Sequence, residues 1–151
     1  MQNVCKISLR VRAGDTDFTG FAYNVRCLEW FSVGRIELFR SIGIQYSSDG
    51  SIIINNEEQN VSFVIGEVYA KFHSPARFDD LLELETEIED IGEKILRFEH
   101  NIFKKIDGRL LVSGHSVYIC IDKKSVKSIK IPLEIRTLLN NYLKIGNTNK
   151  S

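Results

Sequence analysis

Residues 14–24, with the sequence GDTDFTGFAYN, place two aspartates directly before a helix-like pattern. A carboxylate in that position could activate water as a general base or attack a carbonyl carbon itself. The first backbone N–H groups of the helix, around Asn24 and Val25, would lack partners within the helix and carry a partial positive charge. They could therefore polarise a carbonyl oxygen as an oxyanion hole. The segment suits acyl-group hydrolysis, with Asp15 and Asp17 as the candidate carboxylates.

The same residue types also have a structural interpretation. Aspartate and glycine are common in turns and before helices, so residue chemistry alone favours a structural role for Asp17. Asp15 is expected to form the turn or to pair with Arg10 or Arg12. Gly20 is expected to give the loop a positive φ, or to let the backbone approach a ligand closely.

Two elements must hold this loop in place. Residues 4–12 alternate between apolar and polar side chains, which predicts a half-buried strand. Residues 25–41 carry apolar side chains at helical spacing on several faces, which predicts a helix that is buried on most sides. Asn24 is its expected N-cap, and Gly43 is the residue expected to stop it. The loop is therefore predicted to run from the end of a strand into the start of a buried helix.

The rest of the chain is rich in strand patterns, joined by turn signals such as Asp107-Gly108. Gly66 is expected to mark a bulge, and Pro132 is expected to open a short final helix. The predicted strands cover residues 51–54, 61–73, 82–89, 94–106 and 109–121. An antiparallel sheet can bury one face, and the single apolar helix would fill that face. We therefore predict an α+β fold, a curved antiparallel sheet wrapped around one long central helix.

Alternation also predicts faces and boundaries. Within residues 61–73, Val64 and Val68 are expected on one face, and within residues 109–121 a face is shared by Leu111, Val117, Ile119 and Ile121. Residues 1–145 are predicted to form a single domain, followed by a polar, frayed tail at residues 146–151.

Composition argues against several classes of function. The 20 basic and 20 acidic residues cancel, which argues against bulk electrostatic binding to nucleic acid or to a membrane surface. No apolar run is long enough to span a membrane. Three cysteines without a CxxC pair favour a reducing, cytoplasmic compartment. The three histidines are far apart in the sequence, so we expect no metal site.

Three segments carry a resemblance to a known family. They are residues 11–24 (VRAGDTDFTGFAYN), residues 28–43 (LEWFSVGRIELFRSIG) and residues 74–86 (SPARFDDLLELET). Together with IPLEIRTLL near the C-terminus, they resemble the 4-hydroxybenzoyl-CoA thioesterase-like family of hotdog-fold acyl-CoA thioesterases. The likeness spans nearly the whole chain, and its first segment is the most specific. It implies hydrolysis of an acyl-CoA thioester to the free acid and CoA, without a cofactor.

The resemblance also implies roles for residues. It places the catalytic carboxylate at Asp17, as general base or nucleophile, and the backbone N–H of Asn24 opposite the carbonyl. The candidates for substrate binding are Gly20, Tyr23, Val25, His73 and Arg77. Members of this family form homodimers or homotetramers with active sites at the dimer interface, so we expect the same kind of assembly here.

Four positions depart from the family pattern. Many members have a histidine where this chain has Asn24, and a tyrosine where it has Ala13. The helix usually carries a glutamate at the position of Ser32 and a tyrosine at the position of Cys27. The alternative function is therefore a non-hydrolytic protein that binds an acyl thioester. A hotdog dehydratase is disfavoured, because it usually needs the histidine that Asn24 replaces.

Several other residues have competing interpretations. Arg77 could contact the CoA phosphates or form a salt bridge to one of the aspartates that follow it. His73 is more typical of a hydrogen-bonded histidine at a strand edge than of a ligand. Trp30 is expected to pack in the core or in a dimer interface. The lysine run at residues 122–130 could meet nucleotide phosphates, although such runs usually form a solvated face.

Overall fold

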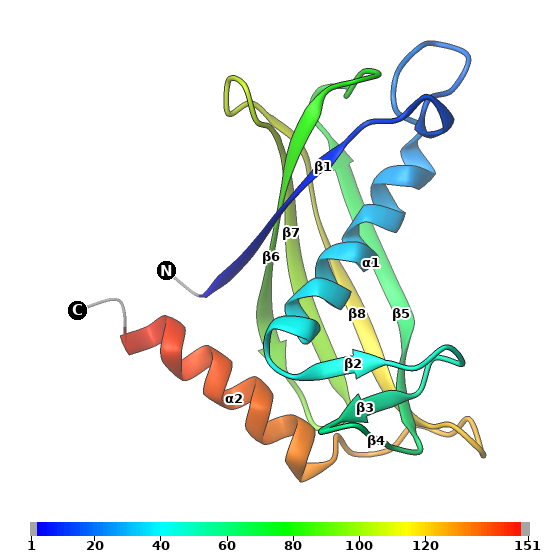
Figure 1. Ribbon diagram of the computed structural model, residues 1–151, viewed down its shortest axis with the longest axis vertical. Coiled ribbons are helices and arrows are strands. Elements are labelled where there is room, and N and C mark those ends of the chain that lie inside the picture. Colours follow the sequence, from blue (N-terminus) through cyan, green and yellow to red (C-terminus); the bar gives the residue numbers. More distant parts are fainter. Residues whose placement is uncertain (1–2, 149–151) are drawn as a thin grey trace.

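A long helix, α1 (Asn24–Ser41), lies on the inner face of a five-stranded antiparallel sheet. The structure is a computed structural model that describes residues 3–148, with side chains as far as Ile145. The strands are β1 (Val4–Arg10), β5 (Val61–Phe72), β6 (Leu81–Ile91), β7 (Ile95–Lys104) and β8 (Leu110–Asp122), in the order β1-β6-β7-β8-β5. Figure 1 shows the sheet curving around α1, with β1 and β5 at its edges. The predicted α+β architecture is confirmed.

The ends of α1 follow from its flanking residues. Gly43 has φ of +90° just beyond the helix, as predicted for the residue that stops it. The prediction that Asn24 is the N-cap is wrong, because Asn24 is the first helical residue and Tyr23 is the N-cap. The backbone N–H of Tyr23 donates to the carbonyl of Asp15 at 2.7 Å, which holds Tyr23 extended and starts the helix one residue later. Tyr23 makes no side-chain capping bond.

The end of the molecule opposite the loop is closed by three short strands and a second helix. The strands β2 (Ile44–Tyr46), β3 (Ile52–Ile54) and β4 (Glu57–Glu58) form a small antiparallel sheet, of which only β3 was predicted. Figure 1 shows this sheet and α2 (Leu133–Thr148) together at the foot of the molecule. Helix α2 extends into the predicted tail, whose residues 149–151 lie outside the described part of the chain.

The predicted bulge in β5 is confirmed, and it changes which residues face the helix. The register with β8 shifts between Ile65 and Glu67, around Gly66. Before the bulge Val64 pairs with outward-facing Ile119, whereas after it Val68 pairs with a buried, inward-facing residue. The prediction that Val64 and Val68 share a face is therefore wrong.

The face of β8 that packs against α1 also differs from the apolar face that was predicted from the sequence. Its buried residues include Gly114, Ser116, Tyr118 and Cys120, and the predicted face of Val117 and Ile119 points outward. Glycine is required at position 114, because a Cβ there would lie 2.0 Å from the carbonyl oxygen of Tyr69. Gly114 thus lies where the backbone of β5 and the Phe31 ring of α1 both come close to β8.

The core consists of two apolar clusters along α1. The cluster nearer the loop includes Cys27, Trp30, Leu84, Ile102 and Val112, and the other includes Leu38, Phe39, Ile88, Phe98 and Tyr118. Both clusters draw on α1, β6, β7 and β8. The helix is therefore anchored at two levels, and the first level supports its N-terminal turns.

A polar layer lies between the two clusters, formed by Thr86, His100 and Ser116. The Nδ1 of His100 is 3.0 Å from the Oγ1 of Thr86, and its Nε2 is 2.8 Å from the Oγ of Ser116. The His100 ring stacks on Phe31 with centroids 4.4 Å apart, and burial lowers the pKa of His100 to about 3. The histidine is therefore neutral, and both ring nitrogens are hydrogen-bonded. Gly34 leaves room for Thr86, because a Cβ there would lie 2.2 Å from its hydroxyl.

Candidate active site

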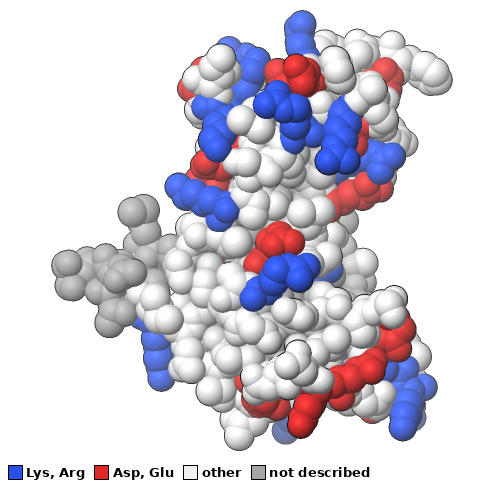
Figure 2. Space-filling view, viewed as in Figure 1, with Lys and Arg blue, Asp and Glu red and all other residues white. Residues whose placement is uncertain are grey.

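A cavity of about 260 Å³ opens where the loop meets the first turns of α1. Asp17, Thr19 and Asn24 supply its polar rim. Its interior is apolar and is lined by residues that include Cys27, Trp30, Phe72, Ile102, Leu111 and Val112. Figure 2 shows basic and acidic side chains intermixed at this end of the molecule. The arrangement suits a ligand with a polar reacting group and an apolar body.

The loop is held in shape by its own backbone bonds. The N–H of Asp17 donates to the carbonyl of Phe21 at 2.9 Å, and Gly20 has φ of +82°, which confirms its predicted conformation. The N–H of Ala22 donates to the carbonyl of Ala76 at 2.8 Å. This bond ties the loop to the segment that follows β5 and fixes the two sides of the cavity mouth.

Asp17 is an exposed carboxylate with one engaged oxygen. Its Oδ1 accepts hydrogen bonds from the hydroxyl of Thr19 at 2.5 Å and from the backbone N–H of Thr19 at 2.8 Å. These bonds, the hydroxyl first, hold the pKa of Asp17 below its ordinary value. Its Oδ2 accepts no hydrogen bond from the described residues. The side chain is therefore ionised near neutral pH, with one oxygen available.

Asp15 has a different environment. Its Oδ2 accepts the backbone N–H of Arg12 at 2.8 Å, which confirms the predicted role in the turn. Its Oδ1 lies 3.7 Å from the Nε of Arg26, whereas the predicted alternative partner Arg10 pairs with Asp79. Asp15 does not line the cavity. The two aspartates of the loop are thus separated by the fold, and only Asp17 is at the cavity.

The N-terminus of α1 reaches the same cavity. Asn24 lines the rim as the first helical residue, and Tyr23 leaves the helix without a side-chain cap. The first N–H groups of a helix have no acceptors within it and carry a partial positive charge. They are therefore free of side-chain capping at the place where a carbonyl oxygen would need donors.

The remaining predicted site residues are spread around the cavity. His73 is among the lining residues, and its ring Nε2 lies 2.7 Å from the hydroxyl of Ser113. The guanidinium of Arg77 stacks over Phe21 at 5.2 Å, and its backbone N–H, not its side chain, bonds to the following Asp80. Gly20, Tyr23, Val25 and Arg77 are not among the lining residues. Their predicted roles in substrate binding stay predictions.

Residue chemistry alone did not find the cavity walls. Trp30 is 8% exposed, and its predicted place in the core is confirmed, but it also lines the cavity. Cys27 is 3% exposed, and burial raises the pKa of its thiol to about 11. Both residues follow Asn24 on the core side of α1, at three and six positions further on. That helical spacing from Asn24 was the feature of the sequence that could have identified them as cavity residues.

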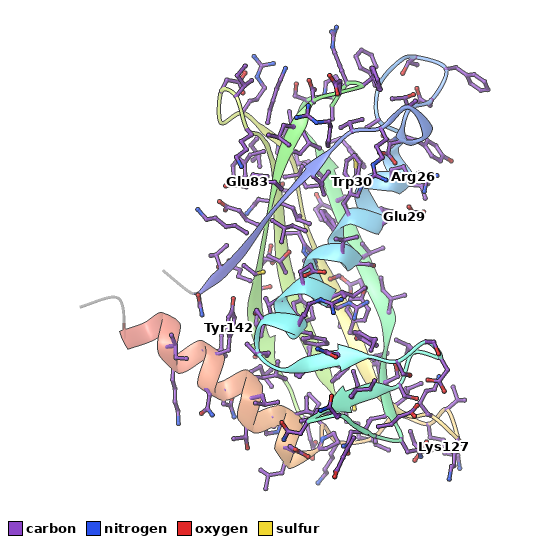
Figure 3. All side chains as sticks on the ribbon, viewed as in Figure 1. Arg26, Glu29, Trp30, Glu83, Lys127 and Tyr142 are labelled. Atoms are coloured by element: carbon purple, nitrogen blue, oxygen red, sulfur yellow. The ribbon has the colours of Figure 1, made fainter. Side chains whose placement is uncertain are left out.

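The lysine run at residues 122–130 lies far from the cavity within one chain. Asp122 pairs with Val61 at one end of β5, whereas Phe72 lines the cavity at the other end. The eleven steps between Val61 and Phe72 span about 36 Å at a strand's rise. In Figure 3, Lys127 is labelled at the foot of the molecule and Trp30 in its upper part.

Other site types are constrained by the described residues. None of the described helices is long and apolar enough to cross a membrane. Residues 3–148 contain no group of three or more histidine, cysteine, aspartate or glutamate side chains that could hold a metal ion. The cysteines Cys5, Cys27 and Cys120 are free thiols.

Comparison with known proteins relates the fold and the cavity to an enzyme family. A model of the Thioesterase-like superfamily matches residues 11–139. Acyl-CoA thioesterase YbgC of Haemophilus influenzae is 27% identical over 137 residues, which cover 90% of this chain and 94% of that protein. A solved structure named Probable Thioesterase from Bartonella henselae is 26% identical, with a TM-score of 0.71, and covers 86% of this chain and 99% of its own.

A more distant structure shows how far the fold is shared. DHNA-CoA thioesterase from Staphylococcus aureus has a TM-score of 0.83 and covers 98% of this chain and 96% of its own, at 17% identity. At that identity the likeness establishes the fold alone. The family model, which spans most of the chain, confirms the resemblance drawn from the sequence segments. The chain belongs to the Thioesterase-like superfamily, a family of hotdog-fold thioester hydrolases.

Proposed function

We propose that this protein is an acyl-CoA thioesterase that hydrolyses an acyl-CoA to the free acid and CoA. The observation that carries the proposal is that Asp17 and the first residue of α1, Asn24, line one cavity with an apolar interior. A carboxylate, a set of N–H donors and an apolar acyl site are what thioester hydrolysis requires. The acyl-CoA specificity in the names of relatives such as YbgC agrees with this assignment.

In the proposed reaction, the thioester oxygen accepts hydrogen bonds from the backbone N–H groups at the start of α1. Asp17 either takes a proton from the attacking water or attacks the carbonyl carbon to form an anhydride that water then cleaves. In both routes the C–S bond breaks, and the CoA thiolate leaves and takes up a proton. The lowered pKa of Asp17 keeps the carboxylate ionised, which both routes need. The Asn24 side chain can orient water but cannot shuttle a proton.

The test is a panel of short, long and aromatic acyl-CoA esters, followed by release of free thiol. Asp17→Asn should lower kcat by at least about a hundredfold, the scale of a lost general base. Asp15→Asn is the matched control, because it changes the neighbouring carboxylate that bonds to Arg12 and does not line the cavity. If Asp15→Asn abolished turnover in a folded protein and Asp17→Asn did not, the assignment of the two aspartates would be wrong.

The second candidate is a protein that binds acyl thioesters without hydrolysing them. Asn24 favours it, because this residue stands where many family members carry a histidine. Its distinguishing result is binding of acyl-CoA esters with no thiol release across the whole panel. Turnover of even one ester class that depends on Asp17 excludes it.

We also propose a cytoplasmic homodimer, or a tetramer of such dimers, joined along β5. This edge strand exposes large apolar side chains, including Ile65 and Tyr69 at 53% each and Phe72 at 45%. Long apolar edges are normally covered, and Phe72 also lines the cavity, so the partner would lie beside the site. The free thiols agree with a reducing compartment. A monomer in light scattering would rule out the shared site.

A further inference from the structure

Closely packed apolar side chains close the inner end of the candidate cavity. Its inner walls are Cys27, Ile102, Leu111 and Val112, each at most 3% exposed. All four belong to the apolar cluster nearer the loop, which is packed against the sheet. A chain that enters past Asp17 therefore meets closely packed side chains, and the depth of the cavity sets how much of it can be buried.

Trp30 forms a wall shared by two cavities. It lines the candidate site and also lines a second, solvent-open cavity of about 400 Å³ between β1 and α1, whose other lining residues are partly apolar, as Leu9 and Val33, and partly charged, as Arg10 and Asp15. Figure 3 shows Trp30 beside the upper part of α1, close to where β1 passes. The indole is therefore the partition between the acyl site and additional space behind it.

Position along the helix gives the depth at which the partition stands. Cys27 and Trp30 follow Asn24 by three and six residues, or about 4.5 and 9 Å along the helix axis. An extended carbon chain advances about 1.25 Å per bond, from a bond of about 1.5 Å and an angle near 111°. A chain that runs parallel to α1 from a carbonyl at the first turn thus reaches the level of Trp30 after about seven carbons.

The closed inner walls and the depth of Trp30 together indicate a short acyl site. We propose that Cys27 and Trp30 restrict the substrate to short-chain or single-ring aromatic acyl groups, with Trp30 as the stop. The inference rests on the proposed thioesterase function, and it adds the substrate class and two specificity-determining residues to it.

Cys27 acts in this proposal through its size. Burial keeps the thiol protonated, so it is a small apolar wall and not a nucleophile. A larger residue at this position would narrow the cavity nearer its mouth. Cys27 and Trp30 therefore predict opposite changes: enlarging the first shortens the accepted chain, and trimming the second lengthens it.

Binding can be tested without turnover, because Trp30 is the only tryptophan in the chain. Non-hydrolysable S-butyl-, S-octyl- and S-dodecyl-CoA thioethers are titrated while tryptophan emission is followed, with calorimetry for the affinities. Butyl- and octyl-CoA should change the emission, and dodecyl-CoA should bind at least about tenfold more weakly than octyl-CoA, the scale of an ill-fitting group in an apolar pocket. Equal affinities for the octyl and dodecyl ligands would overturn the proposal.

Variants then test the partition itself. Trp30→Leu should join the two cavities and remove the tenfold penalty on dodecyl-CoA, measured by calorimetry and by kcat/KM on the matching esters. Cys27→Val should instead lower the affinity for octyl-CoA more than the affinity for butyl-CoA. This variant still tests the proposal if Trp30→Leu fails to fold. Val33→Ala is the control, because Val33 lines only the second cavity. An unchanged chain-length profile in folded Trp30→Leu would refute the proposed stop.

Different results would refute the proposed thioesterase function and the proposed limit on acyl size. Length-selective binding of the thioethers with no ester turnover supports the acyl-size limit and contradicts the thioesterase function. Asp17-dependent turnover that is equally fast for butanoyl-, dodecanoyl- and hexadecanoyl-CoA supports the function and contradicts the size limit.

Discussion

The neutral histidine of the polar layer should make the stability of this protein fall in mild acid. The pKa of His100 is lowered to about 3 by burial, whereas an unfolded histidine titrates near about 6.5. Between these values the unfolded chain binds more protons than the folded one, so stability is complete above pH 6.5 and is lost as pH falls. At about 1.4 kcal/mol per pH unit, the loss between pH 7 and pH 5 is about 2 kcal/mol.

Urea unfolding at pH 7 and pH 5 measures this effect when wild type is compared with His100→Gln. The variant will be less stable at both pH values, because it loses the stacking on Phe31. Its loss of unfolding free energy between pH 7 and pH 5 should nevertheless be about 2 kcal/mol smaller than that of wild type. Glutamine cannot take up the proton, so the difference isolates the histidine.

The comparison is needed because another group acts in the opposite direction. Burial, with a contribution from Glu89, raises the pKa of Glu99 to about 7, so its proton is bound more tightly in the folded protein. That group adds stability as pH falls from 7 toward 4.5, and Glu99→Gln should steepen the acid loss. If wild type and His100→Gln lost the same free energy between pH 7 and pH 5, the account of His100 would be refuted.

Two further predictions concern single contacts. Gly34→Ala should lower the unfolding free energy by about 1–3 kcal/mol, because its Cβ would lie 2.2 Å from the Thr86 hydroxyl, whereas Gly14→Ala meets no atom within 4 Å and should change the melting temperature little. Thr19→Val should raise the pKa of Asp17, so the acidic limb of the kcat/KM profile should move to higher pH, and an unmoved limb would contradict the role of that hydrogen bond.

The elements could be predicted where their pattern is uniform along the chain. The apolar spacing of residues 25–41 was sufficient for α1, and the pattern of residues 82–89 was sufficient for the strand β6. The N-cap was missed because the bond from Tyr23 to the carbonyl of Asp15 depends on how the loop closes, which local propensity does not encode. The bulge at Gly66 was expected, but its effect on Val64 requires the actual register.

The interior was harder to predict because some of it is polar. Alternation assigns apolar residues inward, yet Thr86, His100 and Ser116 are buried and satisfied by one another. Arg35 also occupies a core position of α1, with its guanidinium 4.0 Å from the ring centroid of Tyr118. The catalytic assignment of Asp17 came from the family resemblance. The cavity walls could not be derived, because sequence does not distinguish a residue beside a void from one that is packed.

The polar layer also determines which pairing of the strands is correct. A slip of two residues between neighbouring strands keeps every side chain on its own face, so alternation between core and solvent cannot exclude it. A two-residue slip of β6 against β7 would bring an apolar residue, Leu84 or Ile88, opposite His100 and leave the hydroxyl of Thr86 and the Nδ1 of His100 without each other. The hydrogen bonds of this one polar row therefore select the register of β6, β7 and β8. Because Phe31 stacks on His100 in the same row, the row also fixes the position of α1 along the sheet.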